Sequence, residues 1–208
     1  MPKVKIPRKS VAVDMTAMCD VSFLLLTFFI LTAKFRPTET VMIDTPTSRA
    51  TAKAPEDIMT ITVDSSGKTY IGFSVPKRRT EALESMIERY GAKYPQLNSL
   101  TPEQIINFAN VETFGNSIAE LPALLKLKSD EIAKVKMGGV PRDSIDNQLG
   151  NWVNAARYSA TDEGLDLPIA IKGDKNADVI AVKEVIDMMR ERDVFRFNLL
   201  TTQEGKID

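Results

Sequence analysis

The sequence predicts an α+β protein: a single N-terminal transmembrane helix, then a small domain of helices packed on one face of a sheet, with a helical insertion. Two observations support this prediction. The apolar stretch at residues 11–33 is long enough to span a bilayer, because about 20 helical residues cross a hydrocarbon core of about 30 Å. After it, segments of alternating apolar and polar residues are interspersed with segments of helical periodicity.

The composition excludes several kinds of site. A chain of 208 residues suffices for one domain and an anchor, and a net charge of −1 gives no basic excess that would predict nucleic-acid binding. Histidine is absent, which excludes His-based triads and His metal sites, and the single cysteine, Cys19, excludes an intrachain disulfide. No phosphate loop, metal-ligand spacing or nucleophile–base set occurs, so we expect no enzyme, metal or cofactor.

Composition divides the chain into four parts. Residues 1–13 form a basic tail, 14–34 the membrane helix, 35–57 an extended linker rich in Thr, Pro, Ser and Ala, and 58–208 the folded domain. Four basic residues precede the apolar stretch and two follow it, which predicts a cytoplasmic N-terminus and a periplasm-like location for the rest. These basic residues are Lys3, Lys5, Arg8 and Lys9 before the stretch, and Lys34 and Arg36 after it.

Two alternatives to a retained membrane helix stay open. A basic N-terminus before the apolar core Val21–Leu31 is also the pattern of a cleaved signal peptide. Leu31 stands where cleavage needs a small residue, and Asp14 and Asp20 interrupt the region before the core, which argues against cleavage. The second alternative is a buried helix of a soluble protein, against which the basic flank and the unbroken run Leu24–Leu31 favour lipid.

Asp20 is the strongest functional candidate, because a charged residue within a membrane helix costs on the order of 3 kcal/mol on insertion scales. Thr16 and Thr27 share its helical face and complete a narrow polar stripe. An isolated helix would leave Asp20 without a partner, so we expect an oligomer or another membrane protein around it. From the residues alone, Asp20 either carries protons, neutral in one exposure and ionised in the other, or only hydrogen-bonds a neighbouring helix.

Asp14 requires a different explanation. It lies six residues before Asp20, a rotation of about 240°, so the two carboxylates do not face each other and do not form an acid–base pair. At the start of the helix, its oxygen can accept hydrogen bonds from the free amides of the first turn. We therefore expect Asp14 to be an N-cap.

Alternation and turn residues predict the elements of the domain. Met59–Val63 and Thr69–Phe73 read as two strands joined by the turn 64–67, followed by a helix with one apolar face. Near the C-terminus, a short strand around Ile169 and Ile171, a helix over 179–192 and a last strand over 195–201 follow; Phe195, Phe197 and Leu199 alternate in that last strand. The segment 172–178 between strand and helix is expected to be a turn with capping residues.

The stretch from about 91 to 164 is expected to be the insertion. Thr101 and Gln104 form a capping box, and Ile118, Leu121 and Leu125 suggest a short helix. A further amphipathic helix should enter at Asp143 and Ser144, and its stripe includes Trp152, which we expect in the core rather than at a binding surface. The stripe comprises Ile145, Leu149, Trp152, Val153 and Ala156.

The segment 13–26, VDMTAMCDVSFLLL, resembles the signature of the ExbD/TolR family, in which a basic tail precedes a V-[ND]-x-T-P-x-x-D-V pattern. Thr16, Asp20 and Val21 match it, while Ala17 stands where many members have proline. The segments 41–48 and 167–175 are also similar to family segments, although Thr45 replaces a usual leucine. The resemblance implies that Asp20 translocates protons.

The resemblance also implies partners and a location. These are an ExbB/TolQ-like multi-helix protein forming a ring, a TonB- or TolA-like protein, and a second copy of this chain, in a bacterial inner membrane with the C-terminal domain in the periplasm. The linker is either a docking strand, with Val41, Ile43 and Pro46 as contact candidates, or a plain tether.

Three functional hypotheses stay open. The leading one is a proton-driven energy transducer; the others are an anchored periplasmic scaffold and a secreted binding domain. Within the first, the sequence does not decide between transport, envelope integrity and motility.

Overall fold

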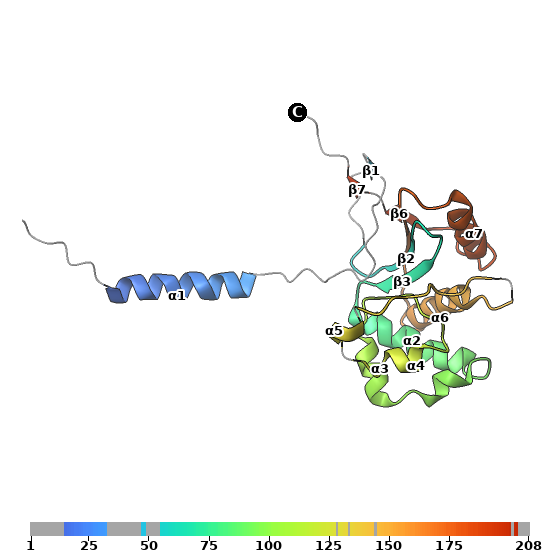
Figure 1. The fold of residues 1–208 in the computed structure, drawn as a ribbon, viewed down its shortest axis with the longest axis horizontal. Helices are drawn as coiled ribbons and strands as arrows, with labels where there is room; N and C mark the ends of the chain where they lie inside the picture. The colour runs from blue at the N-terminus through green and yellow to red at the C-terminus, as the bar shows by residue number, and fades with distance from the viewer. Residues whose placement is uncertain are drawn as a thin grey trace, which may run out of the picture. The chain divides into compact units, whose positions relative to one another are not determined.

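The computed structural model describes residues 15–32, 47–48, 55–127, 129–132, 134–143, 145–200 and 202–203. These residues belong to two separate units, of which the first ends at Pro37 and contains helix α1, and the second contains all other elements (Figure 1). The basic tail, the expected N-cap Asp14 and most of the linker, including the contact candidates Val41, Ile43 and Pro46, lie outside the described residues.

Helix α1 runs over Met15–Thr32 and has 18 residues, which corresponds to a length of about 27 Å. None of its side chains is buried by the rest of the chain. Among the described residues it is the one helix with the length and apolar composition to cross a membrane. All 18 residues lie within the span predicted for the membrane helix, 14–34, of which residues 14, 33 and 34 lie outside the described residues.

The second unit is built on a five-stranded mixed sheet with the order β4-β3-β2-β5-β6. Strands β2 and β3 form the expected antiparallel hairpin, with Met59 opposite Phe73 and Val63 opposite Thr69. Strand β5 pairs parallel to β2, and β6 pairs parallel to β5. The strands are β2 (Met59–Val63), β3 (Thr69–Phe73), β4 (Thr113–Phe114), β5 (Ile169–Gly173) and β6 (Asn198–Leu200), and a separate parallel pair joins β1 (Thr47–Ser48) to β7 (Thr202–Gln203).

Helices pack on the sheet in the way the fold class predicts. Helix α7 (Val179–Arg190) connects the parallel strands β5 and β6, and its buried residues belong to the same core as those of α2 (Pro76–Tyr90) and α6 (Gln148–Asp162). Alternate residues of the strands face these helices in one continuous core. The strand residues in this core are Met59, Ile61, Val63, Ile71, Phe73, Ile169 and Ile171.

The connection from β3 to β5 contains most of the helices. Its longest helices, α2 (Pro76–Tyr90) and α6 (Gln148–Asp162), pack against each other, and Trp152 of α6 is fully buried against Phe108 and Phe114, with ring centroids 5.9 and 4.9 Å away. The expected insertion therefore supplies a large part of the core. The smaller elements are η1 (Pro95–Ser99), α3 (Pro102–Phe108), α4 (Leu121–Leu124) and α5 (Ser129–Ile132), and α7 (Val179–Arg190) connects β5 to β6.

Several local predictions are confirmed. The capping box forms at Thr101, which accepts from the Gln104 amide while the Gln104 side chain accepts from the Thr101 amide. The helix near Leu121 exists, with Leu121 and Leu125 both buried. Asp178 caps α7 by accepting from the Ile180 amide, so the segment after β5 is a turn and a cap.

The predicted start of α6 was wrong. Ile145 belongs to the apolar periodicity but is 93% exposed, and the helix begins at Gln148. Asn147 is the N-cap, because its Oδ1 accepts a hydrogen bond from the Gly150 amide at 2.8 Å. A capping side chain therefore outweighed the periodicity that extended the helix back to Asp143.

The predicted last strand was placed too early. Pairing with β5 begins at Asn198, opposite Ala170, and Phe195 is 70% exposed. The chain is still in the turn that ends α7 at Val194, whose amide donates to the carbonyl oxygen of Met189, so Phe195 directly follows this turn. The strand is therefore short, and helix α7 ends at Arg190 rather than at residue 192.

Candidate functional site

Asp20 lies on α1 in an apolar environment without support from its own helix. It is exposed, and no side chain of residues 15–32 forms a hydrogen bond or ion pair with its carboxylate. The large apolar residues around it are also open, with exposed fractions from 52% at Leu25 to 85% at Leu31. A carboxylate in such a setting needs a lipid-shielded partner or a water-filled path.

The hydroxyl groups of α1 are largely used by the helix itself. Thr27 donates its hydroxyl hydrogen to the carbonyl oxygen of Leu24 at 2.9 Å, and Ser22 donates to Met18 at 2.8 Å. Thr27 also lies about 10.5 Å along the axis from Asp20, beyond direct contact. The Thr27 hydroxyl oxygen can therefore only accept a hydrogen bond, from a water molecule or from a partner beside the stripe.

Thr16 lies one turn before Asp20 on the same face, so α1 brings the three residues of the predicted stripe into line. The stripe is flanked by apolar side chains on both sides. Residues 15–32 supply no side-chain donor to an ionised Asp20. The arrangement suits a carboxyl group that gains and loses a proton at a protein–protein contact within the membrane.

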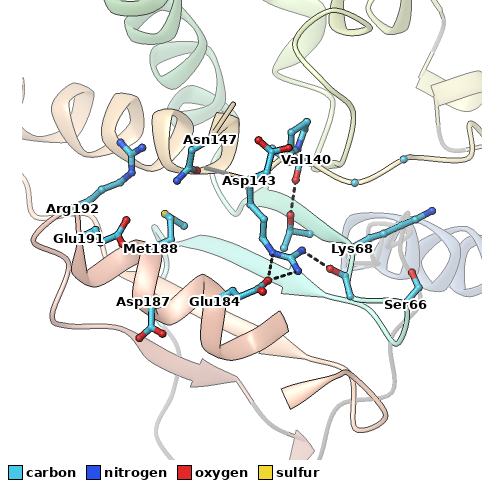
Figure 2. A pocket seen from close by; sticks show the side chains of 16 residues that line it. Ser66, Lys68, Val140, Asp143, Asn147, Glu184, Asp187, Met188, Glu191 and Arg192 are labelled. Carbon is cyan, nitrogen blue, oxygen red and sulfur yellow. Dashed lines mark hydrogen bonds and ion pairs between the residues drawn. The ribbon is translucent and has the colours of Figure 1, made fainter. Parts of the chain in front are cut away.

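The second unit has a polar pocket of about 1140 Å³ between the β2–β3 turn, the loop 138–143 and α7. Arg142 crosses it, donating to Glu184 Oε2 at 3.0 Å and to the carbonyl oxygen of Gly67. Figure 2 shows Glu184 turned toward this turn, whereas Asp187 points away from it. The pocket thus contains charges of both signs, and the ion pair of Arg142 ties its walls together.

No cluster of three or more metal-ligating side chains occurs in the part of the chain that the structure describes. The Asp64 carboxylate near the pocket is occupied by structural contacts. It accepts hydrogen bonds from Ser66, from the Lys68 amide and from the Tyr70 hydroxyl. Burial opposes ionisation of Asp64, but these hydrogen bonds outweigh it and hold its pKa below the ordinary value.

The strongest charge cluster of the unit surrounds Arg78, whose side chain is only 5% exposed. Its Nη2 and Nε donate to Asp57 Oδ2 at 2.9 and 3.1 Å, and its Nη1 donates to Glu81 at 2.7 Å and to Glu163 at 3.1 Å. Burial opposes the charged form, but the carboxylates outweigh it and raise the pKa of Arg78. The exposed Lys77 joins the rim of the cluster by pairing with Glu81 and Glu163.

A second buried arginine, Arg79, binds backbone rather than carboxylates. It is 4% exposed and donates to the carbonyl oxygen of Phe73 at 2.8 and 3.1 Å and to that of Ala109. Burial lowers its pKa, while the charge of Glu112 acts in the opposite direction. Arg79 therefore ties the end of β3 to the end of α3.

Sequence reasoning did not predict the Arg78 cluster. One signal was available: α2 begins with Lys77, Arg78 and Arg79, although the positive end of a helix dipole favours acidic residues. Cations in the first turn of a helix indicate that acceptors from elsewhere in the fold surround some of them, as Asp57 and Glu163 do at Arg78.

Comparison with known proteins gives one match. A family model described as biopolymer transport protein ExbD/TolR matches residues 7–204, which include Asp20 and the whole of the described second unit. No curated protein and no solved structure matches the chain.

Proposed function

The chain belongs to the ExbD/TolR family, and from this premise we propose that it is the proton-channel subunit of an inner-membrane motor. Membership gives it a membrane-anchored role in biopolymer transport or energy transduction, and its one N-terminal apolar helix fits a single-pass protein. In the proposal, proton flow through Asp20 drives a TonB-like protein that powers transport across the outer membrane.

The observation that supports this proposal is the carboxylate of Asp20 on a helix that supplies it with no donor. A ring of ExbB/TolQ-like subunits around α1 would exclude lipid from the polar stripe and provide water or polar groups. The carboxyl group would then be neutral in one position and ionised in the other. A membrane potential contributes about 2.3 kcal/mol per charge per 100 mV, which can drive this cycle in one direction.

In this mechanism the tail lies in the cytoplasm and the second unit in the periplasm, with two copies of the chain in the ring. Thr16 and Thr27 supply oxygen atoms to water beside Asp20. The linker carries the movement of α1 outward, and Val41, Ile43 and Pro46 are the proposed contacts with the TonB-like partner. No step requires a cofactor or catalysis by the second unit. We call this unit the outer unit, because the proposal places it outside the inner membrane.

The test replaces Asp20 by Asn in cells that depend on this chain for proton-driven uptake. Asn is nearly the same size and forms hydrogen bonds but cannot carry a proton, so uptake should fall more than 100-fold. Ser22→Ala, a nearby change on the opposite face, should leave uptake within twofold of the wild type. Membrane levels and copurification of the multi-helix partner should be equal in all three chains. Full uptake by D20N would rule out the proton-carrier role.

The alternative is an anchored periplasmic scaffold of TolR-like character, in which Asp20 only joins helices by hydrogen bonds. The unsatisfied carboxylate also supports this function, because a partner helix could satisfy it without proton transfer. D20N separates the two functions, since Asn retains the hydrogen bonds. The mass of the intact mature chain tests the secreted alternative, which requires loss of the N-terminal segment.

A further inference from the structure

We propose that Arg78 is a positioning residue that fastens the end of the linker to the helix layer, so that movement of α1 enters the outer unit at this point. This inference rests on the proposed function, because it needs a membrane helix that moves. We call residues 56–58, which directly precede β2, the entry strap. Every tension transmitted from α1 along the chain must pass through this strap before it reaches β2.

All three residues of the entry strap are bound either to Ser74, which lies between β3 and α2, or to Arg78 in the first turn of α2. Ser74 donates its hydroxyl to the carbonyl oxygen of Glu56 at 2.7 Å and accepts from the Ile58 amide at 2.9 Å. The Ser74 amide donates to the carbonyl oxygen of Ile58 at 3.2 Å. Between these bonds, Asp57 receives two hydrogen bonds from Arg78 on a single oxygen.

Arg78 extends this hold to α6. Its Nη1 also binds Glu163, the residue directly after α6, and Glu81 one turn along α2. The guanidinium therefore joins three segments that are distant in the sequence: the strap, α2 and the end of α6. Its planar fork makes these contacts simultaneously, which a lysine cannot do with one ammonium group.

The cation of the cluster is sheltered from water, whereas the side chains of Asp57 and Glu163 are 34% and 33% exposed. The Arg78 side chain is 5% exposed, and Asp57 Oδ1 is buried with no hydrogen-bond partner among the described residues. Partly buried ion pairs are screened by salt less than pairs between exposed side chains. The strap is thus held by a charged contact that salt weakens less than it weakens a surface pair.

Among the described residues, the linker makes one other backbone contact with the unit, the parallel pairing of β1 with β7. That pairing covers two residues on each strand, Thr47 with Thr202 and Ser48 with Gln203. The strap combines three hydrogen bonds to Ser74 with the forked ion pair to Arg78. We therefore expect β1 to separate under tension before the strap does.

The test compares Asp57→Ala with two matched variants in the full-length chain within its membrane complex. Asp57→Ala removes the strap's ion pair and leaves Arg78 bound to Glu81 and Glu163. Lys77→Ala removes the neighbouring cation, which contacts Glu81 and Glu163 but not the strap. Asp57→Glu keeps the carboxylate.

We expect Asp57→Ala to lower proton-driven transport at least tenfold while the Asp20-dependent proton flux stays within twofold of the wild type. Lys77→Ala and Asp57→Glu should retain both activities. Normal transport by Asp57→Ala would overturn the inference, and so would a parallel loss of proton flux, which indicates faulty assembly. Loss of transport in a chain that ends at Leu200, with Asp57→Ala unaffected, would assign the hold to β1 and β7 instead.

Hydrogen exchange separates failure of this inference from failure of the proposed function. In the purified full-length chain, Asp57→Ala should speed exchange of the Ile58 and Ser74 amides at least tenfold and leave the amides of β3 unchanged. Unaltered exchange at both amides would overturn the role of Arg78 at the strap. Normal uptake by D20N would instead remove the motor that the strap is proposed to serve.

Discussion

Helix α1 and the outer unit treat apolar surface and charge in opposite ways. In α1 no side chain is buried, and Asp20 has no partner among residues 15–32. In the outer unit the large apolar side chains form one core, and the buried guanidinium groups of Arg78 and Arg79 are bound by carboxylates or carbonyl groups. The difference teaches that the outer unit binds its buried cations with its own acceptors, whereas residues 15–32 of α1 supply no such partner to Asp20.

The largest expected effect tests this difference with the same truncation in each region. Phe108→Ala removes a fully buried ring that stacks on Trp152, and should lower the free energy of unfolding of the outer unit by about 3–5 kcal/mol. Phe23→Ala removes a ring that is 63% exposed and should leave that free energy unchanged. The chain has a single tryptophan, so Trp152 emission in a urea titration of the full chain reports on the outer unit alone.

The contrast between the regions would be broken by either of two results. A loss of less than about 1 kcal/mol for Phe108→Ala would mean that the aromatic cluster is not essential to the core. A shift of the urea midpoint for Phe23→Ala would mean that α1 contributes to the stability of the outer unit.

A smaller effect should follow the charge of Asp64. Its hydrogen bonds from Ser66, Lys68 and Tyr70 outweigh its burial and lower its pKa in the folded chain, so the folded state favours the ionised form. The resulting stability is present above the pKa of the unfolded chain, about 3.9, and is lost as the pH falls through the lower folded value. The advantage of wild type over Asp64→Asn in free energy of unfolding should therefore shrink below about pH 4.

The hydrogen bond from the Tyr70 hydroxyl to Asp64 also makes the free energy of unfolding depend on pH at high pH. Burial, followed by the hydrogen bond to Asp64 and its charge, raises the pKa of Tyr70 to about 12. This contribution is present below pH 10 and should be lost as the pH rises through 12. Urea titrations from pH 3 to pH 12 measure the loss of stability at the acidic end and at the alkaline end. D20N should leave the free energy of unfolding unchanged at every pH in this range. An altered profile for D20N would couple the two regions.

The smallest effect concerns the ends of two helices of the outer unit. Helices α6 and α7 both end in a Schellman motif, whose left-handed residue is Gly164 with φ +74° after α6 and Asp193 with φ +58° after α7. Asp193→Gly should stabilise the unit by about 0.5–1 kcal/mol, because glycine adopts this conformation without strain. Gly164→Ala should destabilise it by about 1 kcal/mol.

Urea titrations followed by Trp152 emission measure the free energy of unfolding of both variants, Asp193→Gly and Gly164→Ala. Equal signs for the two changes would contradict the assignment of the motif. If Asp193→Gly were stabilising and also lowered transport, the aspartate side chain would have a further role in the assembled complex.

The sequence allowed prediction of those features that depend on neighbouring residues. The span of α1, the stripe with Asp20, the hairpin, the Thr101 capping box and the burial of Trp152 all follow from local periodicity or turn chemistry. The start of α6 and of β6 could not be found in this way, because the Asn147 cap and the turn that ends α7 at Val194 outweighed the apolar pattern.

The Arg78 cluster shows a second limit. Its carboxylates, Asp57 and Glu163, lie 21 and 85 residues away in the chain. The pairing of β2 with β3 brings Asp57 to Arg78, and the packing of α2 against α6 brings Glu163. The role of Asp20 stays a prediction for a related reason. The partner proposed for it belongs to another molecule, which neither this sequence nor this fold contains.

The parallel order of β2, β5 and β6 has a mechanical consequence. The chain enters at the amino end of β2 and leaves at the carboxyl end of β6, so these two points lie at opposite ends of the sheet. A pull between them loads the strands in shear, and the hydrogen bonds across five residue pairs of β2 with β5 resist together. A hairpin pulled at its open end would instead unzip one bond at a time. Such a sheet can transmit tension along its strands, because many hydrogen bonds must break together before it extends.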